Sequence, residues 1–150
     1  DLSAQIKEHL VTKGYLALAQ GVMTQPEGRV DAPVGRHPRN RTRMSVVVGG
    51  REARTNYKVI ESFDYSCLLE LYLETGRTHQ IRVHLSSIGH PVVGDTTYSK
   101  NRSDLGLGRQ FLHASELAFD HPLDGRRVTF ESRLPKDLAE LLERLRGLET

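Results

Sequence analysis

The sequence predicts an α+β fold, in which a mainly antiparallel mixed sheet is packed against helices. Several short runs of aliphatic, β-branched and aromatic residues are separated by turn signals, as is typical of antiparallel strands. Only a few short stretches show helical spacing, and there are no internal repeats or heptads. The 150 residues are enough for one domain with a real core, so we expect residues 1–150 to form a single domain.

The first predicted elements are a helix and a strand. Leu2, Ile6 and Leu10 recur at four-residue intervals, which predicts a short amphipathic helix. Residues 13–19 predict a strand. The next stretch, residues 23–43, is rich in Pro, Gly, Arg and Asn, and we expect it to be a loop with little regular structure.

More strands are expected after that loop. Residues 44–48 predict a strand that ends at a Gly-Gly turn signal. Residues 53–63 and 66–73 predict two longer strands, joined by a hairpin turn near Asp64.

The C-terminal part of the chain predicts a second strand pair and a closing helix. Residues 111–119 and 127–132 are expected to pair, because an Asp-Gly sequence favourable for a turn lies between them. In the closing helix, leucines recur at three- and four-residue steps and charged residues occupy the other face, which predicts a core contact. These leucines are Leu138, Leu141, Leu142 and Leu145.

Positive charge is concentrated in one part of the chain, although the formal net charge is only +2. Residues 29–58 contain eight Lys or Arg, seven of them Arg, against two acidic residues. A basic stretch on an otherwise balanced domain is typical of a nucleic-acid binder, and Arg suits bidentate phosphate contacts. A solvated, arginine-rich loop is the alternative; we favour RNA as the partner.

Cys67 is the only cysteine, so no disulfide can form within the chain, and we expect a buried thiol. No apolar run approaches the length of a membrane span, and the first residues do not resemble a signal peptide. These observations predict a soluble, cytoplasmic protein with no membrane partner.

The segment from Gly76 to Asp95 is the most informative part of the chain. It follows a strand, turns at Gly76, and predicts a helix over residues 78–88 that Gly89 ends. Arg, Thr, His and Gln side chains cluster at the expected helix N-terminus, where free backbone N–H groups and the helix dipole favour an anion. The segment therefore predicts a phosphate or carboxylate site, with a capped helix and solvated charges as an equal alternative.

This segment resembles the signature of the RluA family of pseudouridine synthases, which isomerise uridine in structured RNA. The match consists of Gly76-Arg77-Thr78-His79-Gln80-Ile81-Arg82-Val83-His84, followed by Gly89-His90-Pro91 and Gly94-Asp95. Residues 15–18 with Gly21 resemble a second family motif. Residues 109–114 resemble the closing stretch of the family. Residues 36–38, 41–44 and 53–57 resemble the branch that acts on large-subunit ribosomal RNA, although members of the family also act on transfer RNA.

The resemblance implies a role for each matching residue. Arg82 corresponds to the basic partner of the catalytic aspartate, and Tyr15 to the tyrosine that stacks on the uracil and can move a proton. Ile81 corresponds to an apolar residue of the active site. The residues expected to contact RNA are Arg77, Thr78, His79, Gln80 and Ile81 in the signature, with Arg36, His37 and Arg41 in the basic stretch. No cofactor is implied.

The resemblance also implies a residue that this sequence does not contain. The catalytic aspartate of the family lies in an Arg-Leu-Asp motif upstream of a Leu-Ser-Ala-Gln stretch, which here is residues 2–5. No Arg-Leu-Asp occurs in the chain, so we expect the C-terminal portion of a synthase catalytic domain that is inactive alone. An RNA-binding fragment and a catalytically inactive paralogue are the alternatives. Asp95 is expected to act only as an acceptor that supports a turn.

A metal site is not predicted from the histidines. His79, His84 and His90 are spaced by five and six residues, which does not place them on one face of a helix. The oligomeric state, the RNA and the uridine that is modified are not determined by these patterns.

Overall fold

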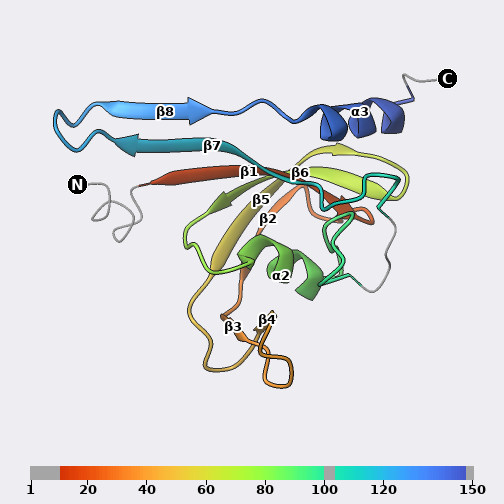
Figure 1. The fold of residues 1–150 in the computed structure, drawn as a ribbon, viewed down its shortest axis with the longest axis horizontal. Coiled ribbons are helices and arrows are strands. Elements are labelled where there is room, and N and C mark those ends of the chain that lie inside the picture. The colour runs from red at the N-terminus through yellow and green to blue at the C-terminus, as the bar shows by residue number, and fades with distance from the viewer. Residues whose placement is uncertain (1–10, 100–103, 148–150) are drawn as a thin grey trace.

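A computed structural model describes residues 11–99 and 104–147. The helix predicted over residues 2–10 lies outside the described residues. Six strands form one sheet in the order β2-β5-β6-β1-β7-β8, and every pairing in it is antiparallel (Figure 1). The strands are β1 (Thr12–Gln20), β2 (Glu27–Asp31), β5 (Arg54–Ser62), β6 (Ser66–Leu73), β7 (Leu112–Asp120) and β8 (Arg127–Glu131). The predicted α+β fold is confirmed.

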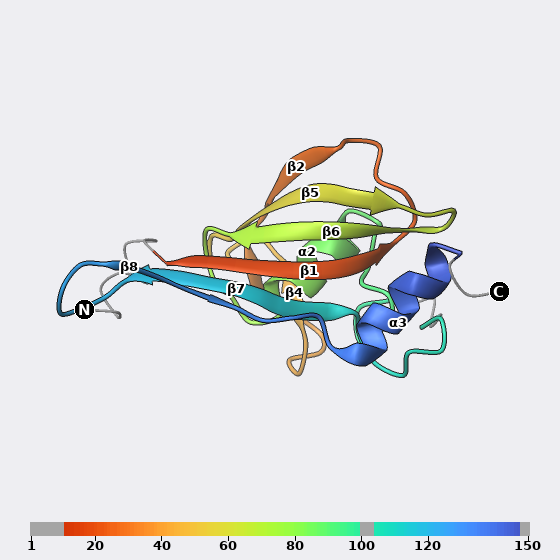
Figure 2. The same ribbon diagram turned by 90° about the horizontal axis from the view of Figure 1, so that it is seen from above.

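Two helices cover opposite faces of this sheet. Helix α2 (Gln80–Ser87) packs with Ala17, Ala19 and their neighbours on β6, whereas helix α3 (Lys136–Leu145) packs with Leu18 and Leu68. Successive residues of a strand point to opposite faces of the sheet, so Ala17 and Leu18 point to different faces. Because Ala17 packs with α2 and Leu18 packs with α3, the two helices lie on opposite sides of the sheet. Figure 2, seen from above, shows α3 in front of the sheet and α2 behind it.

This arrangement explains why β6 is almost continuously apolar. The first four residues of the strand, Ser66 to Leu69, are buried, because α2 covers one face and α3 covers the other. Cys67 is fully buried, as predicted. The leucine pattern of α3 is confirmed as well: Leu138, Leu141 and Leu142 are at most 4% exposed.

The prediction of a loop over residues 23–43 was wrong. Strand β2 lies at the edge of the large sheet and pairs with β5, and β3 (Val34–Arg36) pairs with β4 (Met44–Val46) in a separate two-stranded sheet. Each of β2 and β3 has a single buried residue, Val30 and Val34. Such short, largely exposed strands lack the alternation of apolar and polar residues that identifies a strand in a sequence. Their pairing with β5 and with β4 defines them instead.

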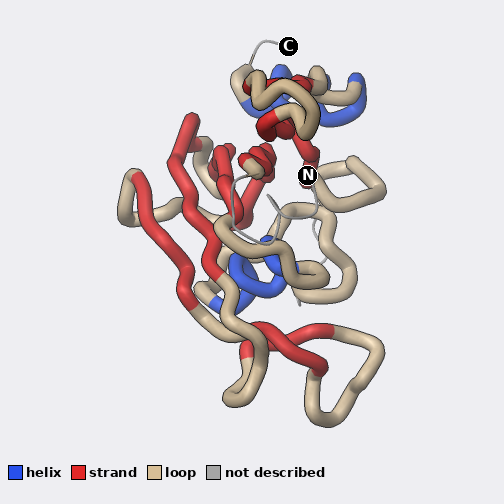
Figure 3. Tube along the Cα trace, turned by 90° about the vertical axis from the view of Figure 1, so that its left-hand side faces the viewer, coloured by secondary structure: helices blue, strands red, loops and turns tan. Residues whose placement is uncertain are grey.

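Strands β3 and β4 form a small hairpin that extends away from the sheet on the α2 side. Figure 3 shows it at the foot of the molecule, far from the face covered by α3. Strand β4 contacts α2, so the hairpin is attached to the helix that carries the signature. Its connecting loop holds much of the positive charge noted in the sequence. We call residues 34–46 the basic hairpin.

Helix α2 begins later than predicted, at Gln80, because His79 adopts a left-handed conformation with φ of 55°. Gly89, with φ of 84°, follows the end of the helix as predicted. No helix among the described residues is long and apolar enough to span a membrane.

Candidate active site

The turn between β6 and α2 is held together by the side chain of Gln80, which is only 2% exposed. Its Oε1 accepts hydrogen bonds from the Thr75 hydroxyl (2.6 Å) and the Arg77 backbone N–H (3.0 Å). Its Nε2 donates to the Arg54 carbonyl and to the Thr55 hydroxyl, both at 2.9 Å. Gln80 thus ties the signature turn to β5. An amide so fully engaged with protein atoms orients its neighbours.

The same network continues to His84, which is fully buried. The Thr55 hydroxyl lies 2.8 Å from His84 Nδ1, and His84 Nε2 lies 2.8 Å from the carbonyl of Ala32. Because a carbonyl can only accept, Nε2 carries the proton and donates, and Nδ1 accepts from the hydroxyl. Burial lowers the pKa of His84, which favours this neutral form. The chain of bonds links α2, β5 and the segment that leads into the basic hairpin.

Arg82 forms a bidentate ion pair with Asp95 on the side of α2 that faces this hairpin. Arg82 Nε donates to Asp95 Oδ2 at 2.8 Å, and Arg82 Nη2 donates to Oδ1 at 3.0 Å. Oδ1 also accepts from the backbone N–H groups of Thr97 (2.9 Å) and Tyr98 (3.0 Å). Asp95 supports a turn, as predicted, and it also orients Arg82. The Nη1 atom of Arg82 takes no part in this ion pair.

Opposing effects act on the pKa of the Asp95 carboxyl. Burial by itself raises it, but the bonds from Arg82 and from the two backbone N–H groups outweigh burial, so the pKa lies below its ordinary value. The bonds to Asp95 in turn raise the pKa of Arg82 despite its burial. Both groups are therefore ionised at neutral pH.

Tyr98 connects the ion pair to the basic hairpin. The guanidinium carbons of Arg82 and Arg43 each lie 5.0 Å from the centre of its ring, within range of a cation–π interaction. Its hydroxyl accepts from the Met44 backbone N–H at 3.0 Å and lies 2.7 Å from His79 Nδ1. The hairpin and the first turn of α2 thus meet at one side chain.

His79 is held in an unusual conformation at the start of α2. Non-glycine residues rarely adopt positive φ, and those that do are concentrated at functional sites. Desolvation, followed by the nearby Arg82, lowers the pKa of His79, although Asp95 acts in the opposite direction. A neutral His79 is therefore expected at pH 7.

Tyr15 and Ile81 contribute to the core beneath α2. Ile81 is 4% exposed and Tyr15 is half-buried, and both belong to the cluster that α2 makes with β1 and β6. Tyr15 lies where the pairing of β1 with β7 shifts register. Burial raises the pKa of its hydroxyl, which keeps it protonated at neutral pH.

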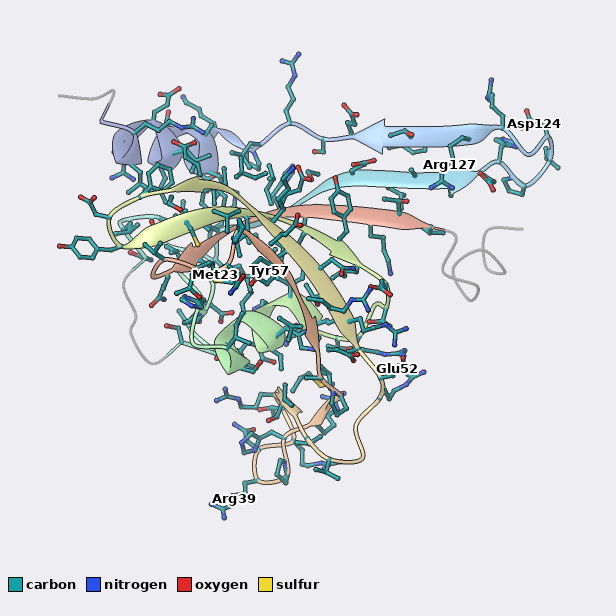
Figure 4. All side chains as sticks on the ribbon, turned by 180° about the vertical axis from the view of Figure 1, so that it is seen from behind. Met23, Arg39, Glu52, Tyr57, Asp124 and Arg127 are labelled. Carbon is teal, nitrogen blue, oxygen red and sulfur yellow. The ribbon has the colours of Figure 1, made fainter. Side chains whose placement is uncertain are left out.

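The basic residues separate into two groups. Arg29 and Arg54 are neutralised by Glu74, at 2.7 Å and 3.2 Å, and Arg54 also pairs with Glu52. In contrast, three arginines of the basic hairpin are exposed to solvent, whereas Arg43 is half-buried against the Tyr98 ring; Figure 4 labels Arg39 at the far end of the hairpin. The exposed residues of the hairpin include Arg36, Arg39 and Arg41, while His37 is half-buried and accepts from the backbone N–H groups of two neighbours.

Arg77 and Thr78 lie on the remaining side of the signature turn. Arg77 donates to the Glu52 carbonyl at 2.7 Å, and desolvation followed by two nearby arginines lowers its pKa. Thr78 is exposed. Among the described residues, no group of three His, Cys, Asp or Glu side chains lies close enough to hold a metal ion.

The structure therefore brings together Arg82, His79 and the basic hairpin, and it places Gln80 and Ile81 inside the protein. Sequence patterns did not identify Tyr98 or Thr55 as parts of the site, nor the contact between Asp95 and Arg82. One signal was present: Asp95 precedes Thr97 by two residues, a spacing at which an Asp side chain commonly accepts a backbone N–H group in a turn, and Tyr98 follows directly.

Comparison with known proteins identifies the family. A sequence model described as RNA pseudouridylate synthase matches residues 1–87, more than half of the chain. This chain belongs to the RNA pseudouridylate synthase family. The resemblance to the RluA family is confirmed by this model together with relatives named ribosomal large subunit pseudouridine synthase D. A family member with a solved structure, described as Human RNA Pseudouridylate Synthase Domain Containing 1, superimposes with a TM-score of 0.77 at 29% identity and covers 97% of this chain and 69% of its own.

Bacterial family members are more similar in sequence. Ribosomal large subunit pseudouridine synthase D of Nitrosomonas europaea is 50% identical over 155 residues, which cover 99% of this chain and 45% of the relative. An uncharacterized RNA pseudouridine synthase of Chloroflexus aurantiacus is 55% identical over 135 residues, covering 89% of this chain and 42% of the relative. The chain spans about half the length of these two synthases.

Proposed function

We propose that this chain forms part of the catalytic domain of an RNA pseudouridine synthase that acts on large-subunit ribosomal RNA. The single observation that carries the proposal is the Arg82 guanidinium, which is buried to 12% exposure and is aimed by Asp95 and Tyr98. The name of the Nitrosomonas relative, which refers to the large ribosomal subunit, supports the choice of RNA.

The reaction breaks the bond between N1 of uracil and C1′ of the ribose and forms a bond between C5 and C1′. C5 loses a proton and N1 gains one, so no oxidant, reductant or other reactant is required. The reacting atoms are inaccessible in a stacked helix, so the uridine must be flipped out of the RNA. Exposed arginines of the basic hairpin would hold the RNA backbone during this step.

Arg82 would stabilise the ionised aspartate that the family resemblance implies. A carboxylate in a pocket that excludes water is stabilised by a fixed guanidinium nearby. Asp95 occupies Nε and one N–H of Nη2, which leaves Nη1 to face a second carboxylate. Asp95 itself is poorly suited as the nucleophile, because it is 1% exposed and its oxygens already accept four hydrogen bonds.

We propose that the nucleophilic aspartate comes from a segment outside these 150 residues, since they contain no Arg-Leu-Asp motif. Tyr15 would stack on the flipped uracil, and its protonated hydroxyl would move a proton. His79, Arg77 and Thr78 would position the backbone next to that uridine, with Gln80 and Ile81 shaping the turn that carries them.

Pseudouridine formation on unmodified large-subunit ribosomal RNA tests the proposal, with the chain alone and with an upstream segment that contains the motif. We expect product only with the upstream segment, and we expect Arg82→Gln to abolish it. Arg109→Gln is the matched control, because Arg109 makes the same bidentate contact to Asp137 in a solvent-exposed setting.

Three results would contradict parts of this proposal. Product from the chain alone that depends on Asp95 would show that the nucleophile is present among these residues. RNA binding without product under every condition would indicate an RNA-binding fragment or an inactive paralogue. Modification of transfer RNA in preference to ribosomal RNA would show that the substrate assignment is wrong.

A further inference from the structure

Tyr98 lies between the two parts of the candidate site that contact RNA in the proposed function. It is 6% exposed and belongs to a small core cluster with Val34 of the hairpin, Val83 of α2 and Ala53. The loop that carries it is held in place by Asp95, which accepts its backbone N–H. The backbone of Tyr98 is thus held by Asp95, independently of the contacts that its side chain makes with the hairpin and with α2.

The ring and the hydroxyl of Tyr98 make different contacts. The ring contacts the guanidinium groups of Arg82 and Arg43, and it meets the His79 ring edge-on at 5.6 Å between centroids. The hydroxyl accepts from the backbone of Met44, the first residue of β4, and bonds to His79 Nδ1. The Nε of Arg43 is buried without a hydrogen-bond partner among the described residues, and the Tyr98 ring lies 5.0 Å from the same guanidinium.

We propose that Tyr98 is a positioning residue that couples the basic hairpin to Arg82. Its hydroxyl fastens β4 to the first turn of α2, and its ring holds Arg82 at the angle set by Asp95. RNA bound along Arg36, Arg39 and Arg41 is thereby kept in register with the guanidinium that serves the reaction. The RNA part of this inference rests on the proposed function, whereas the fastening of the hairpin does not.

The two roles predict different effects of two substitutions. Tyr98→Phe keeps the ring and removes the hydroxyl, so the hairpin loosens while Arg82 keeps its stacking partner. Tyr98→Leu removes both the hydroxyl and the ring, so Arg82 also loses its stacking partner and is held by Asp95 alone among the described residues. In the synthase that contains the motif, we expect Tyr98→Phe to raise KM for RNA with little change in kcat, and Tyr98→Leu to lower kcat as well.

Amide hydrogen exchange measures the fastening without RNA. We expect the Met44 amide to exchange about fivefold faster in Tyr98→Phe, the effect of losing one net hydrogen bond. Tyr57→Phe is the control, because Tyr57 lies on β5 beside Gly28 and away from the hairpin (Figure 4). An unchanged Met44 rate in Tyr98→Phe would overturn the proposal, whatever the RNA result.

A double-mutant cycle measures the coupling to RNA. We expect Arg41→Ala to weaken RNA binding several-fold in the parent protein and by much less in the Tyr98→Phe background, because a loosened hairpin no longer presents Arg41 to the bound RNA. Additive losses would overturn the coupling. If Arg41→Ala changes nothing in either background while Met44 exchange responds, the RNA role of the hairpin is wrong and only the fastening stands.

Discussion

Replacing Asp95 by Asn should destabilise the protein by about 3 kcal/mol at neutral pH. The Asn side chain is nearly the same size, and its single oxygen can still accept from the Thr97 and Tyr98 N–H groups. Its NH₂ group, however, takes the place of the Oδ2 that accepts from Arg82 Nε, so two donors face each other. A guanidinium that is only 12% exposed is then left without its counter-charge.

The magnitude follows from burial. Removing one partner of a buried ion pair costs about 3–5 kcal/mol, and the Tyr98 ring, which still contacts Arg82, places the loss at the lower end. For a domain of this size, that corresponds to a fall in melting temperature of about 6–12 °C. Denaturant titration of the parent and variant proteins at pH 7 measures the difference in the free energy of unfolding.

Asp137→Asn provides a matched control. Arg109 donates to Asp137 through Nε at 2.7 Å and Nη2 at 2.9 Å, the same geometry as in the buried pair. Both side chains are more than 40% exposed, so water replaces much of what the substitution removes, and the loss should be much smaller. Equal losses for Asp95→Asn and Asp137→Asn would refute the argument that burial determines the contribution of the pair.

The contribution of Asp95 should also depend on pH. Its pKa is lower in the folded state than in the unfolded chain, where it is about 3.9. Its stabilising effect is therefore fully present above the unfolded value and is lost as pH falls through the folded one. The difference between the parent protein and Asp95→Asn should accordingly be constant near pH 7 and shrink below about pH 4; a difference that is unchanged in acid would contradict the assignment.

Three further predictions concern other buried positions. Gly94→Ala should destabilise the protein by about 3 kcal/mol or more, because a Cβ at this position would overlap the Arg109 carbonyl and would also be strained by the positive φ. Gly89 has an equally positive φ but lies in open space, so Gly89→Ala should cost only about 1 kcal/mol. Denaturant titration of the two variants compares these losses. Burial lowers the pKa of His84, so in mild acid the unfolded chain binds a proton that the folded protein does not. The free energy of unfolding should therefore fall as the pH drops below about 6.5. His84→Gln should reduce this decline in a pH series of denaturant titrations. The Cys67 thiol is fully buried and burial raises its pKa, so a thiol reagent should modify it only as fast as the protein opens, and rapid modification of the native protein would contradict this burial.

Sequence patterns identified two kinds of element: helices with one apolar and one charged face, and strands that are buried on both faces. The leucine spacing of α3 and the apolar run of β6 were recognised because burial repeats with the period of the element. The signature around Gly76 also located α2 and the family. Strands β2 and β3 were missed, because each buries one residue and leaves no periodic trace.

The partners within the site were determined only by the tertiary structure. The signature singled out Arg82, but its contact with Asp95, thirteen residues away, was not foreseen; nor was the bond of His84 to Ala32, fifty-two residues away. Periodicity records that a residue is buried and which face it occupies. It contains no information about which polar group lies opposite, because that depends on how β5, α2 and the basic hairpin pack in space. The signature therefore predicts which side chains act, and the packing around Tyr98 and Asp95 determines where those side chains point.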